Sequence, residues 1–279
     1  MIKYLELYRD HMIVSRGYSI NTVSSYIRDI KQYFDVIKDR NIDAYFEFLV
    51  KNNYTVSSQN RKISALSSYY NYLIQFNYEK VNPFYNVEMA KREKKLPDCL
   101  SYDEVLKLIE VSKDDYLDRA IIEVLYGCGL RVSELCNLKI SDIHFEESLI
   151  ECLGKGNKQR YVPINKEALF AINDYLVNCR SKLEYKESDD ILFLSRKGRV
   201  LHREYVNEML KRVANKARIN KNVYPHMLRH TFSTHLLMNG ANLRSIQTML
   251  GHKNLSTTEI YTHVDKKKLM DDYNKYFKE

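Results

Sequence analysis

The sequence predicts a two-domain, mainly α-helical protein with one small antiparallel β-sheet in its second domain. The chain has 279 residues, and at about 150 residues per domain this length favours two domains. Apolar residues recur at helical spacing along most of the chain. With only 8 Gly and 4 Pro, the chain has too few turn residues for an all-β fold or a disordered protein.

The first domain, residues 1–88, is predicted to be a small bundle of about four helices. The expected helices cover approximately residues 5–13, 21–34, 44–49 and 57–76. Gly17 interrupts the periodicity after the first helix, Asn21 is a candidate N-cap for the second, and Pro83 follows the end of the fourth. The domain contains Lys and Arg but no arrangement of residues that indicates catalysis.

A linker is predicted at residues 89–98, because the segment Lys91–Pro97 is basic and poor in apolar residues. The second domain then covers residues 99–279. We expect it to begin with a helix, since Ser101 and Glu104 have the spacing of a capping box, in which each side chain bonds the backbone of the other residue.

A β-hairpin is predicted within the second domain. Residues 149–153 and 159–163 are short segments of strand-forming residues, and they flank the glycine-rich sequence Gly154-Lys155-Gly156. This pattern places Lys155 at the tip of the hairpin. Residues 191–194 are a candidate third strand.

Composition excludes several classes of protein. No apolar run approaches the roughly 20 residues that a membrane helix requires, and Glu6 brings an acidic charge too early for a signal peptide. The five cysteines are odd in number, widely spaced and without a CxxC pair, which fits neither a disulfide framework nor a zinc ribbon. We therefore expect a soluble, cytoplasmic protein with reduced thiols and no membrane association.

Positive charge is concentrated in one part of the second domain. The whole chain has a net charge of +8, and residues 1–90 contribute +2 through 11 basic and 9 acidic side chains. Residues 196–221 hold nine basic side chains against Glu204 and Glu208, a net charge of +7. The basic residues are Arg196, Lys197, Arg199, Arg203, Lys211, Arg212, Lys216, Arg218 and Lys221. Because a solvated helix face usually mixes both signs, this asymmetry favours a polyanionic partner; a merely soluble basic helix is the alternative.

Arg131 has an unusual position near the start of a predicted helix. Gly127 and Gly129 are expected to let the backbone turn tightly just before it. The helix macrodipole disfavours a cation in the first turn unless an anion or a carboxylate compensates it. Glu134, one turn further on, is a candidate for that carboxylate, and an exposed Arg at an ordinary helix start is the alternative.

A second candidate anion site begins at Pro225, a residue that suits the first position of a helix. His226 and Arg229 then project from one face, beside the free N–H groups of the helix start. Metal binding by His226, His230 and His235 is an alternative. No Glu or Cys completes that ligand set, and an Arg among the ligands would repel a cation, so neither a metal nor another cofactor is expected.

Two further candidate residues follow near the end of the chain. A short helix is predicted over residues 243–250, Gly251 ends it, and His252 comes directly after. Tyr261 stands nine residues later. A phenol has a pKa of about 10 and is a poor nucleophile at pH 7 without help, and the chain has 23 tyrosines, so Tyr261 taken by itself would be unremarkable.

Four segments, in this order along the chain, resemble the motifs of the tyrosine recombinases of the phage integrase type, and those of the compact Xer recombinases in particular. The segments are Gly129-Leu130-Arg131-Val132-Ser133-Glu134-Leu135, His226-Met227-Leu228-Arg229-His230-Thr231-Phe232, Leu250-Gly251-His252 and Ile260-Tyr261-Thr262-His263-Val264. Lys155 stands where this family carries its catalytic lysine. The resemblance covers essentially the whole chain, and four motifs in order together with the hairpin lysine are highly specific.

The resemblance implies nucleophilic catalysis by Tyr261. This side chain would attack a DNA phosphate, form a 3′-phosphotyrosyl link and release a 5′-hydroxyl, so that rejoining needs no ATP. Arg131 and Arg229 would clamp the non-bridging phosphate oxygens, which is the task of Mg²⁺ in other enzymes, and His252 would donate a further hydrogen bond to them.

The resemblance also implies the proton donors and acceptors and the domain roles. His226 would assist proton transfer at the nucleophile, and Lys155 would be the general acid for the leaving 5′-oxygen. Residues 1–88 would be a SAM-like core-binding domain, and residues 99–279 the catalytic domain of the two-domain tyrosine-recombinase architecture. Both would hold double-stranded DNA mainly through its phosphates, so that binding is sensitive to salt.

The C-terminal segment, about 266–279, is predicted to be a short helix with Leu269, Met270, Tyr273 and Phe277 on one face. In the family such an exchange helix docks into a neighbouring protomer, links the subunits of a homo- or hetero-tetramer on DNA, and gates the nucleophile. Packing of this helix onto its own domain is the alternative.

The expected function is site-specific DNA recombination of the Xer type, which resolves chromosome or plasmid dimers and serves chromosome partition at cell division. A second Xer-type recombinase is a candidate partner. Integration of a mobile element uses the same chemistry and is the alternative, although the chain has no additional arm-binding domain of the kind found in larger phage integrases. A type IB topoisomerase and a non-enzymatic DNA-binding protein are further alternatives.

Overall fold

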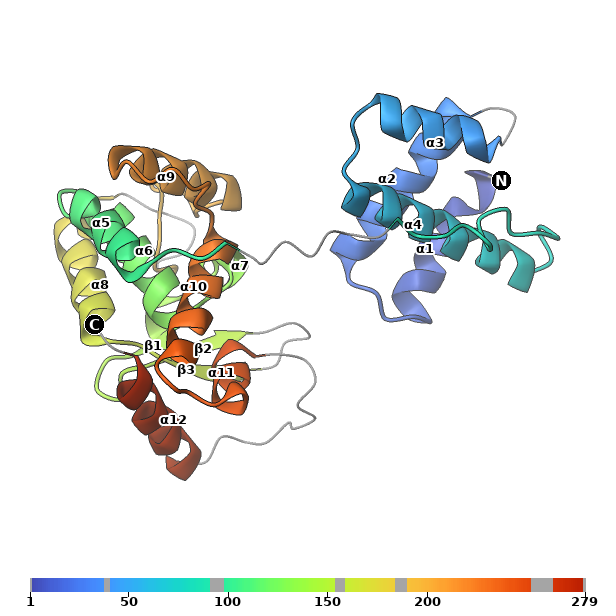
Figure 1. Ribbon diagram of the computed structural model, residues 1–279. Helices are drawn as coiled ribbons and strands as arrows, with labels where there is room; N and C mark the ends of the chain where they lie inside the picture. The colour runs from blue at the N-terminus through green and yellow to red at the C-terminus, as the bar shows by residue number, and fades with distance from the viewer. Residues whose placement is uncertain are drawn as a thin grey trace. The chain divides into compact units, whose positions relative to one another are not determined.

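The structure is a computed structural model that describes residues 2–37, 41–90, 98–153, 159–183, 190–251 and 263–277. The chain divides into two compact units, Met1–Lys95 and Leu96–Glu279. Within the described residues both units consist mostly of helices, and the second also contains a small three-stranded sheet (Figure 1). The expected fold class, mainly α with a small antiparallel sheet, is confirmed.

The N-terminal unit is a helical bundle around an aromatic core. Its helices are α1 (Leu5–Val14), α2 (Ile20–Val36), α3 (Ile42–Lys51) and α4 (Val56–Gln75). The rings of Tyr33, Tyr45 and Tyr69, one from each of α2, α3 and α4, are fully buried at its centre. Helices α2 and α4 are also joined by a buried ion pair, in which Lys62 Nζ lies 2.9 Å from Asp29 Oδ1.

The second helix begins earlier than predicted. Ser19, and not Asn21, is the N-cap of α2, because its backbone is extended and its Oγ accepts a hydrogen bond from the Thr22 N–H at 3.3 Å. Asn21 therefore lies inside the first turn. Ser and Asn are both favourable caps, so spacing alone does not distinguish two candidates two residues apart.

The C-terminal unit is built around helix α6. Its helices are α5 (Tyr102–Ser112), α6 (Tyr116–Cys128), α7 (Val132–Cys136), α8 (Lys166–Asn178), α9 (Arg203–Lys216), α10 (Pro225–Met238), α11 (Leu243–Leu250) and α12 (His263–Tyr276). Helix α6 is buried along most of its length and packs against α5, α8 and α10. The predicted capping box of Ser101 and Glu104 at the start of α5 is confirmed.

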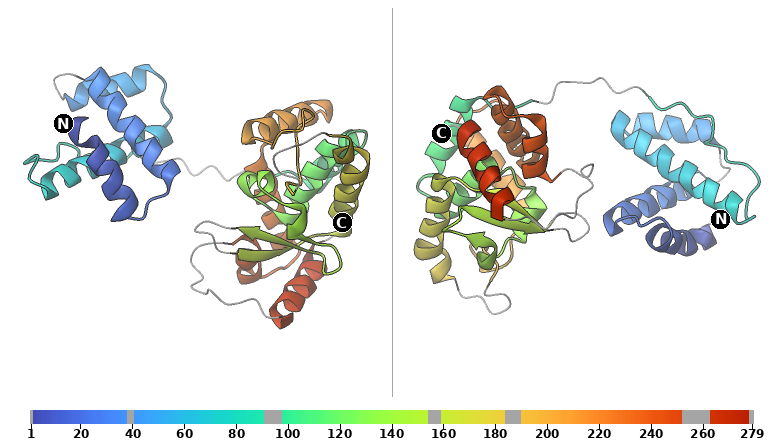
Figure 2. Two further views of the ribbon diagram at one scale, coloured as in Figure 1. Left: turned by 180° about the vertical axis from the view of Figure 1, so that it is seen from behind. Right: turned by 90° about the horizontal axis from the view of Figure 1, so that it is seen from below.

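The sheet contains the predicted hairpin but a different third strand. Its strands are β1 (Ile143–His144), β2 (Leu149–Leu153) and β3 (Gln159–Pro163), antiparallel in that order. The prediction of a third strand at residues 191–194 is wrong. Ile191 and Leu194 make only isolated bridges to Lys139 and Val200, because the backbone here pairs with residues 138–140, which precede the sheet: the Leu192 N–H donates to the Leu138 carbonyl oxygen at 2.8 Å. Helices α11 and α12 contact β3 (Figure 2).

The C-terminal helix α12 packs onto its own domain in this single chain. Leu269, Tyr273 and Phe277 are buried in the core of the C-terminal unit. The Tyr273 hydroxyl donates a hydrogen bond to the carbonyl oxygen of Gly127 at 2.8 Å, and its ring lies against Phe232. The apolar face that was expected to dock into a neighbouring protomer is thus occupied by the protein's own core.

The structure can be compared with the predictions of reduced thiols and of no membrane helix. The five cysteines are free thiols, and Cys128, Cys136 and Cys152 are buried. Burial raises the pKa of the Cys136 thiol to about 11, which makes it unreactive at neutral pH. None of the helices in the described ranges is both long and apolar enough to cross a membrane.

The packing of α12 predicts a stability difference between two substitutions of Tyr273. Tyr273→Phe leaves the Gly127 carbonyl without its donor and should lower the free energy of unfolding by about 1–2 kcal/mol. Tyr273→Ala also removes the buried ring and should cost about 3–5 kcal/mol. Urea denaturation measures both, with exposed Asn274→Ala as the matched control on the same helix. A Tyr273→Ala variant as stable as wild type would contradict the packing described here.

Candidate active site

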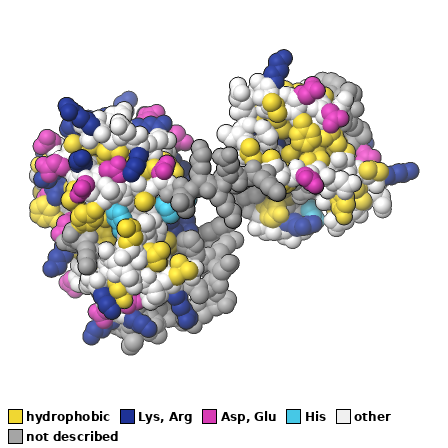
Figure 3. All heavy atoms as spheres, viewed as in Figure 1, with side chains coloured by type: hydrophobic (Ala, Val, Ile, Leu, Met, Phe, Trp, Pro, Cys, Tyr) yellow, Lys and Arg dark blue, Asp and Glu magenta, His cyan; other side chains and the backbone are white. Residues whose placement is uncertain are grey.

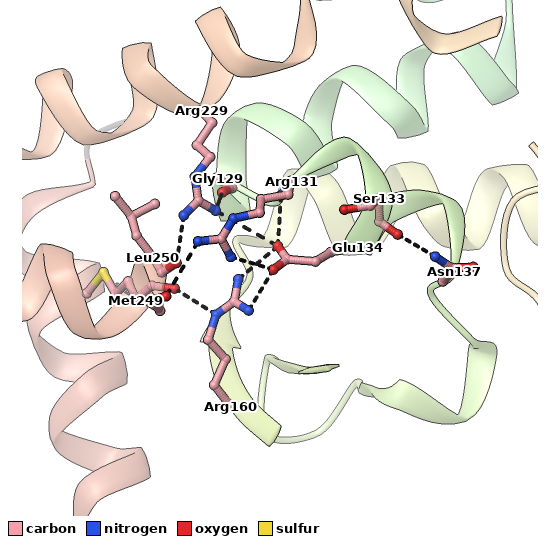
Figure 4. A network of polar contacts seen from close by, with 10 residues as sticks. Gly129, Arg131, Ser133, Glu134, Asn137, Arg160, Arg229, Met249 and Leu250 are labelled. Atoms are coloured by element: carbon pink, nitrogen blue, oxygen red, sulfur yellow. Dashed lines mark hydrogen bonds and ion pairs between the residues drawn. The ribbon is translucent and has the colours of Figure 1, made fainter. Parts of the chain in front are cut away.

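Among the described residues, three arginines from three different elements converge on one carboxylate (Figure 4). Arg131 is the N-cap of α7, Arg160 lies on β3 and Arg229 lies on α10. The carboxylate belongs to Glu134 of α7. The sequence places these residues up to 98 positions apart, so the fold alone brings them together.

A tight turn at Gly129 positions Arg131. Gly129 ends α6 in the left-handed conformation, at φ +60°, and a Cβ added there would lie 2.4 Å from Cδ1 of Phe232. Only glycine fits both the backbone conformation and the space. The prediction that Gly127 also serves the turn is wrong: Gly127 lies inside α6, where it allows a close approach, since an added Cβ would stand 2.7 Å from Asn165 Oδ1.

The predicted pairing of Arg131 with Glu134 is confirmed. Glu134 Oε1 accepts a hydrogen bond from Arg131 Nη1 at 2.7 Å, and Glu134 Oε2 accepts one from the Arg131 backbone N–H at 2.8 Å. The same two oxygens accept from Arg160 Nη1 and Nη2, both at 2.9 Å. Glu134 therefore receives a two-point contact from each of two arginines.

These hydrogen bonds from Arg131 and Arg160 determine the charge state of Glu134. Burial by itself would raise the pKa of the carboxyl, but the hydrogen bonds and charge of Arg160, together with the bonds from Arg131, outweigh it and lower the pKa to about 2. Glu134 is therefore ionised at every physiological pH. Its side chain is only 6% exposed, so solvent does little to screen these interactions.

Arg229 is held by carbonyl groups at two helix ends. Its Nη1 donates to the Gly129 carbonyl and its Nη2 to the Leu250 carbonyl, each at 2.6 Å, and Nη1 lies 3.9 Å from Glu134 Oε2. Burial and the neighbouring charge of Arg131 lower the pKa of the Arg229 guanidinium to about 10, so it stays protonated at neutral pH.

The C-terminal end of α11 is bound to the same cluster. The carbonyl oxygens of Met249, Leu250 and Gly251 each accept a hydrogen bond from a different one of the three arginines. Gly251 caps the helix with φ +62°, as predicted, and an added Cβ there would lie 2.7 Å from Cδ of Arg160. The last described residue before His252 is thus held directly against the arginines.

The four side chains of this cluster carry an excess of positive charge. Three guanidinium groups against one carboxylate leave a net charge of +2. Arg160 and Arg229 are 7% and 6% exposed, whereas Arg131 is 41% exposed, so the cluster reaches solvent through Arg131. A partly buried site with uncompensated positive charge binds anions, and guanidinium groups match the geometry of phosphate oxygens.

The remaining predicted site residues are placed as follows. His226 lies in the first turn of α10 after Pro225, which occupies the predicted first position, and it is exposed, with no hydrogen bond or ion pair to the described part of the chain. Lys155, His252 and Tyr261 lie outside the described residues, and so does most of the predicted linker.

Sequence analysis did not identify Arg160, although a signal was present. In β3 the buried residues alternate with more exposed ones, so that Arg160 and Val162 share the inward face while Gln159 points outward. An arginine on the apolar face of a strand needs a buried counter-charge. The alternation of buried and exposed positions in β3, which begins four residues after Lys155, is the feature that distinguishes Arg160 from the solvent-exposed arginines.

The histidines of α10 do not form a common site. Both ring nitrogens of His235 have protein partners, the Tyr126 hydroxyl and the Leu100 carbonyl oxygen, each at 3.0 Å. Burial lowers the pKa of His235, which favours the neutral ring. Within the described ranges no cluster of three or more His, Cys, Asp or Glu side chains has the arrangement of a metal site.

The basic window 196–221 is partly neutralised within the protein. Arg196 pairs with Asp115, Arg212 with Asp118 and Lys221 with Glu104, all on or beside α5 and α6. Lys and Arg side chains over α9 and α5 accordingly stand next to acidic ones (Figure 3). The net charge of the window therefore overstates the positive charge that is free to meet a partner.

Both units of the chain match known protein families. The model of the phage integrase family matches residues 98–268, and the model of the phage integrase N-terminal SAM-like domain matches residues 5–77. The chain therefore belongs to the phage integrase family, as its four motifs predicted.

Relatives and solved structures agree with this assignment. Tyrosine recombinase XerD of Halalkalibacterium halodurans is 41% identical over 93% of this chain and 92% of the relative. XerD of Oceanobacillus iheyensis is 38% identical over 99% of both chains. A crystal structure of XerA recombinase shares 33% identity over 99% of both chains, with a TM-score of 0.54. XerH bound to palindromic difH substrate in a post-cleavage complex shares 25% identity over 97% of this chain and 83% of XerH, with a TM-score of 0.69. The expected enzyme class, a tyrosine recombinase of the Xer type, is confirmed.

The depressed pKa of Glu134 predicts a pH dependence of stability. A carboxyl whose pKa falls from 4.5 to about 2 on folding stabilises the protein by about 3 kcal/mol above pH 4.5, and this contribution is lost as the pH falls towards 2. The difference in free energy of unfolding between wild type and Glu134→Gln should therefore narrow between pH 6 and pH 3. Urea denaturation across this range measures it, with exposed Glu204→Gln as the control. A difference that stays constant with pH would contradict the buried ion cluster.

Proposed function

We propose that the arginine cluster binds the scissile phosphate of double-stranded DNA, and that the protein cleaves and rejoins DNA through a 3′-phosphotyrosyl intermediate on Tyr261. The observation that carries this proposal is the net charge of +2 at Arg131, Glu134, Arg160 and Arg229, open to solvent at Arg131. These residues come from two of the four recombinase motifs and from the strand that follows the hairpin lysine.

The charge of the cluster suits the transition state better than the bound substrate. A phosphodiester carries one negative charge, and attack by a tyrosyl oxygen produces a five-coordinate phosphorus centre that carries two. A site with a charge of +2 is complementary to that centre, and such differential stabilisation lowers the barrier. Because Arg131 and Arg229 are held in place by Glu134 and by carbonyl groups before DNA arrives, little reorganisation is needed during the reaction.

The other motif residues complete the proton transfers. His226 takes the proton of the Tyr261 hydroxyl as its oxygen attacks phosphorus, and Lys155 gives a proton to the leaving 5′-oxygen. His252 donates a hydrogen bond to a non-bridging oxygen. Rejoining reverses these transfers: the 5′-hydroxyl attacks the phosphotyrosyl bond and Tyr261 leaves. The phosphodiester energy is kept in the covalent link, so the scheme uses no ATP, metal or cofactor.

The cellular role that we propose is Xer-type resolution of chromosome or plasmid dimers in the cytoplasm. Similarity to XerD over nearly the whole chain supports it, as does similarity to the site-specific recombinase XerH in a post-cleavage complex with its palindromic difH substrate. The N-terminal unit would be the core-binding domain, and four protomers, identical or paired with a second Xer-type recombinase, would assemble on DNA. Exchange of α12 between protomers would require its apolar face to leave the core that it occupies here.

Helix α9 is the element of the basic window that we propose to contact the DNA backbone. Lys211 is exposed on this helix and has no ion pair with any described residue, whereas its neighbour Arg212 is paired with Asp118. A cation without an internal partner releases counterions when it meets a phosphate, and a paired one contributes less.

These two neighbours predict different salt dependences. Lys211→Gln should weaken binding to a duplex and reduce the slope of log Kd against log salt concentration by about 1, as expected for one lost phosphate contact. Arg212→Gln should change the slope less, because Asp118 already neutralises that charge. Fluorescence anisotropy across a salt series measures both slopes, and thermal denaturation checks that each variant is folded. Equal reductions for the two variants would contradict the role assigned to the ion pair.

The nucleophile is tested by substitution of Tyr261. Wild type should trap a covalent protein–DNA adduct on a nicked suicide duplex, with a free 5′-hydroxyl end, whereas Tyr261→Phe should bind the same duplex with unchanged affinity and form no adduct. Denaturing gel electrophoresis of labelled DNA detects the adduct, and Tyr276→Phe on α12 is the matched control. Adduct formation by Tyr261→Phe, or none by wild type, would overturn the assignment.

A two-site assay separates the proposed recombinase from a topoisomerase. A recombinase exchanges strands between two copies of its site, whereas a type IB topoisomerase nicks, relaxes and reseals one duplex. Recombinant products from two sites on one plasmid would therefore support the proposal, and relaxation without exchange would favour the topoisomerase. Sequencing of the trapped DNA would then distinguish a chromosomal site from the ends of a mobile element.

A further inference from the structure

We infer that Arg160 is a positioning residue for catalysis: by neutralising Glu134, it keeps the charge of Arg131 available to the scissile phosphate. This inference deepens the proposed function and rests on it. The observation that carries it is that Arg160 supplies half of the hydrogen bonds that the structure gives the Glu134 carboxylate, although Arg160 itself is buried, with 7% of its side chain exposed.

The contacts of Glu134 show what Arg160 prevents. Each carboxylate oxygen accepts one hydrogen bond from Arg160 and one from Arg131, and only one of the latter comes from the Arg131 guanidinium. A buried carboxylate cannot remain uncompensated. If Arg160 were neutral, Glu134 would draw in the guanidinium of Arg131 with both nitrogens, or that of Arg229 from 3.9 Å away.

Loss of the Arg160 charge also lowers the positive charge that is available to the phosphate. With all three arginines the cluster carries +2, and without Arg160 it carries +1. Glu134 would then neutralise the charge of Arg131 or Arg229, because the attraction between a carboxylate and a guanidinium is strong at a site where both are shielded from water. The DNA would meet a site with too little charge for a dianionic transition state.

Arg160 also joins the chain segments that carry the other motif residues. It lies on β3, five residues after Lys155, and its Nε donates to the Met249 carbonyl oxygen at 3.4 Å, at the end of α11 (Figure 4). The close fit of its side chain against Gly251 continues this contact to the residue before His252. One buried side chain thus ties the hairpin, α7 and the end of α11 to a common position.

The test compares two substrates in the same protein. Single-turnover cleavage is measured with saturating enzyme on a suicide duplex whose scissile group is either a phosphodiester or a methylphosphonate. In the methylphosphonate a methyl group replaces one non-bridging oxygen, so the transition state carries one negative charge fewer and needs less positive charge. A defect in available charge should therefore be smaller on this substrate, whereas a smaller folded fraction lowers both rates by the same factor.

Arg160→Met should cleave the phosphodiester about 10²-fold more slowly than wild type, with DNA affinity close to that of wild type. On the methylphosphonate its deficit should shrink to less than about tenfold, as expected when part of the missing electrostatic stabilisation is no longer needed. Arg160→Lys keeps the charge without the two-point contact, and its cleavage rate on the phosphodiester should lie between those of wild type and Arg160→Met. Arg180→Met is the matched control, because Arg180 bonds the Ile191 carbonyl oxygen in the same domain and is not part of the cluster; its rate ratio between substrates should equal that of wild type.

A double variant tests whether Arg160 acts through Glu134. Arg160→Met combined with Glu134→Gln removes the carboxylate that would otherwise consume Arg131. The cleavage rate of the double variant on the phosphodiester should fall no further below wild type than that of the more damaging single variant, because the two residues act as one unit. Losses that multiply would show that Arg160 and Glu134 act separately and would overturn the inference.

The failures of the two proposals are distinguishable. If wild type forms no adduct on either substrate, the proposed function fails. If wild type cleaves both, and Arg160→Met has the same deficit on the phosphodiester and the methylphosphonate, or no deficit, only the role of Arg160 is refuted.

Discussion

The C-terminal unit depends on one buried carboxylate that is shared by arginines from different parts of the chain. Glu134 is excluded from water and therefore requires counter-charges, which it receives from Arg131 one turn away and from Arg160 on a distant strand. Arg229 and the carbonyl groups at the end of α11 complete the cluster. Because these hydrogen bonds join α7, β3, α10 and the end of α11 within one buried cluster, these elements can occupy only a narrow range of relative positions.

The same interaction creates the chemical capacity of the site. A fully neutralised cluster would be stable and inert, whereas this one leaves a charge of +2 that only an anion can compensate. The glycine turn at Gly129 contributes by freeing a carbonyl for Arg229 and by directing Arg131 towards solvent. Structural ion pairing and the proposed phosphate binding thus use the same side chains, and the balance between them is set by how many arginines face the single carboxylate.

Two surfaces show how intramolecular contacts limit what a partner can use. In the basic window, ion pairs with Asp115, Asp118 and Glu104 commit three cations to the fold and leave others, such as Lys211, for a polyanion. On α12, the apolar face around Tyr273 is already buried against α6 and α10. Release of this helix to a neighbouring protomer would have to replace those contacts with equivalent ones, so the proposed exchange would be a balanced equilibrium and not a gain of new buried surface.

The sequence by itself determined the features that depend on neighbours along the chain. The capping box of Ser101 and Glu104, the β2–β3 hairpin and the pairing of Arg131 with Glu134 follow from spacings of a few residues, which fix geometry within one helical turn or one hairpin. The motif resemblance supplied the family. Only the tertiary structure decided the inward position of Arg160, the neutralised part of the basic window, the pairing of residues 190–192 with residues 138–140 and the packing of α12. Each of these joins residues that are far apart in the sequence, and the energy of such contacts depends on which apolar faces bury one another, a property that no local pattern contains.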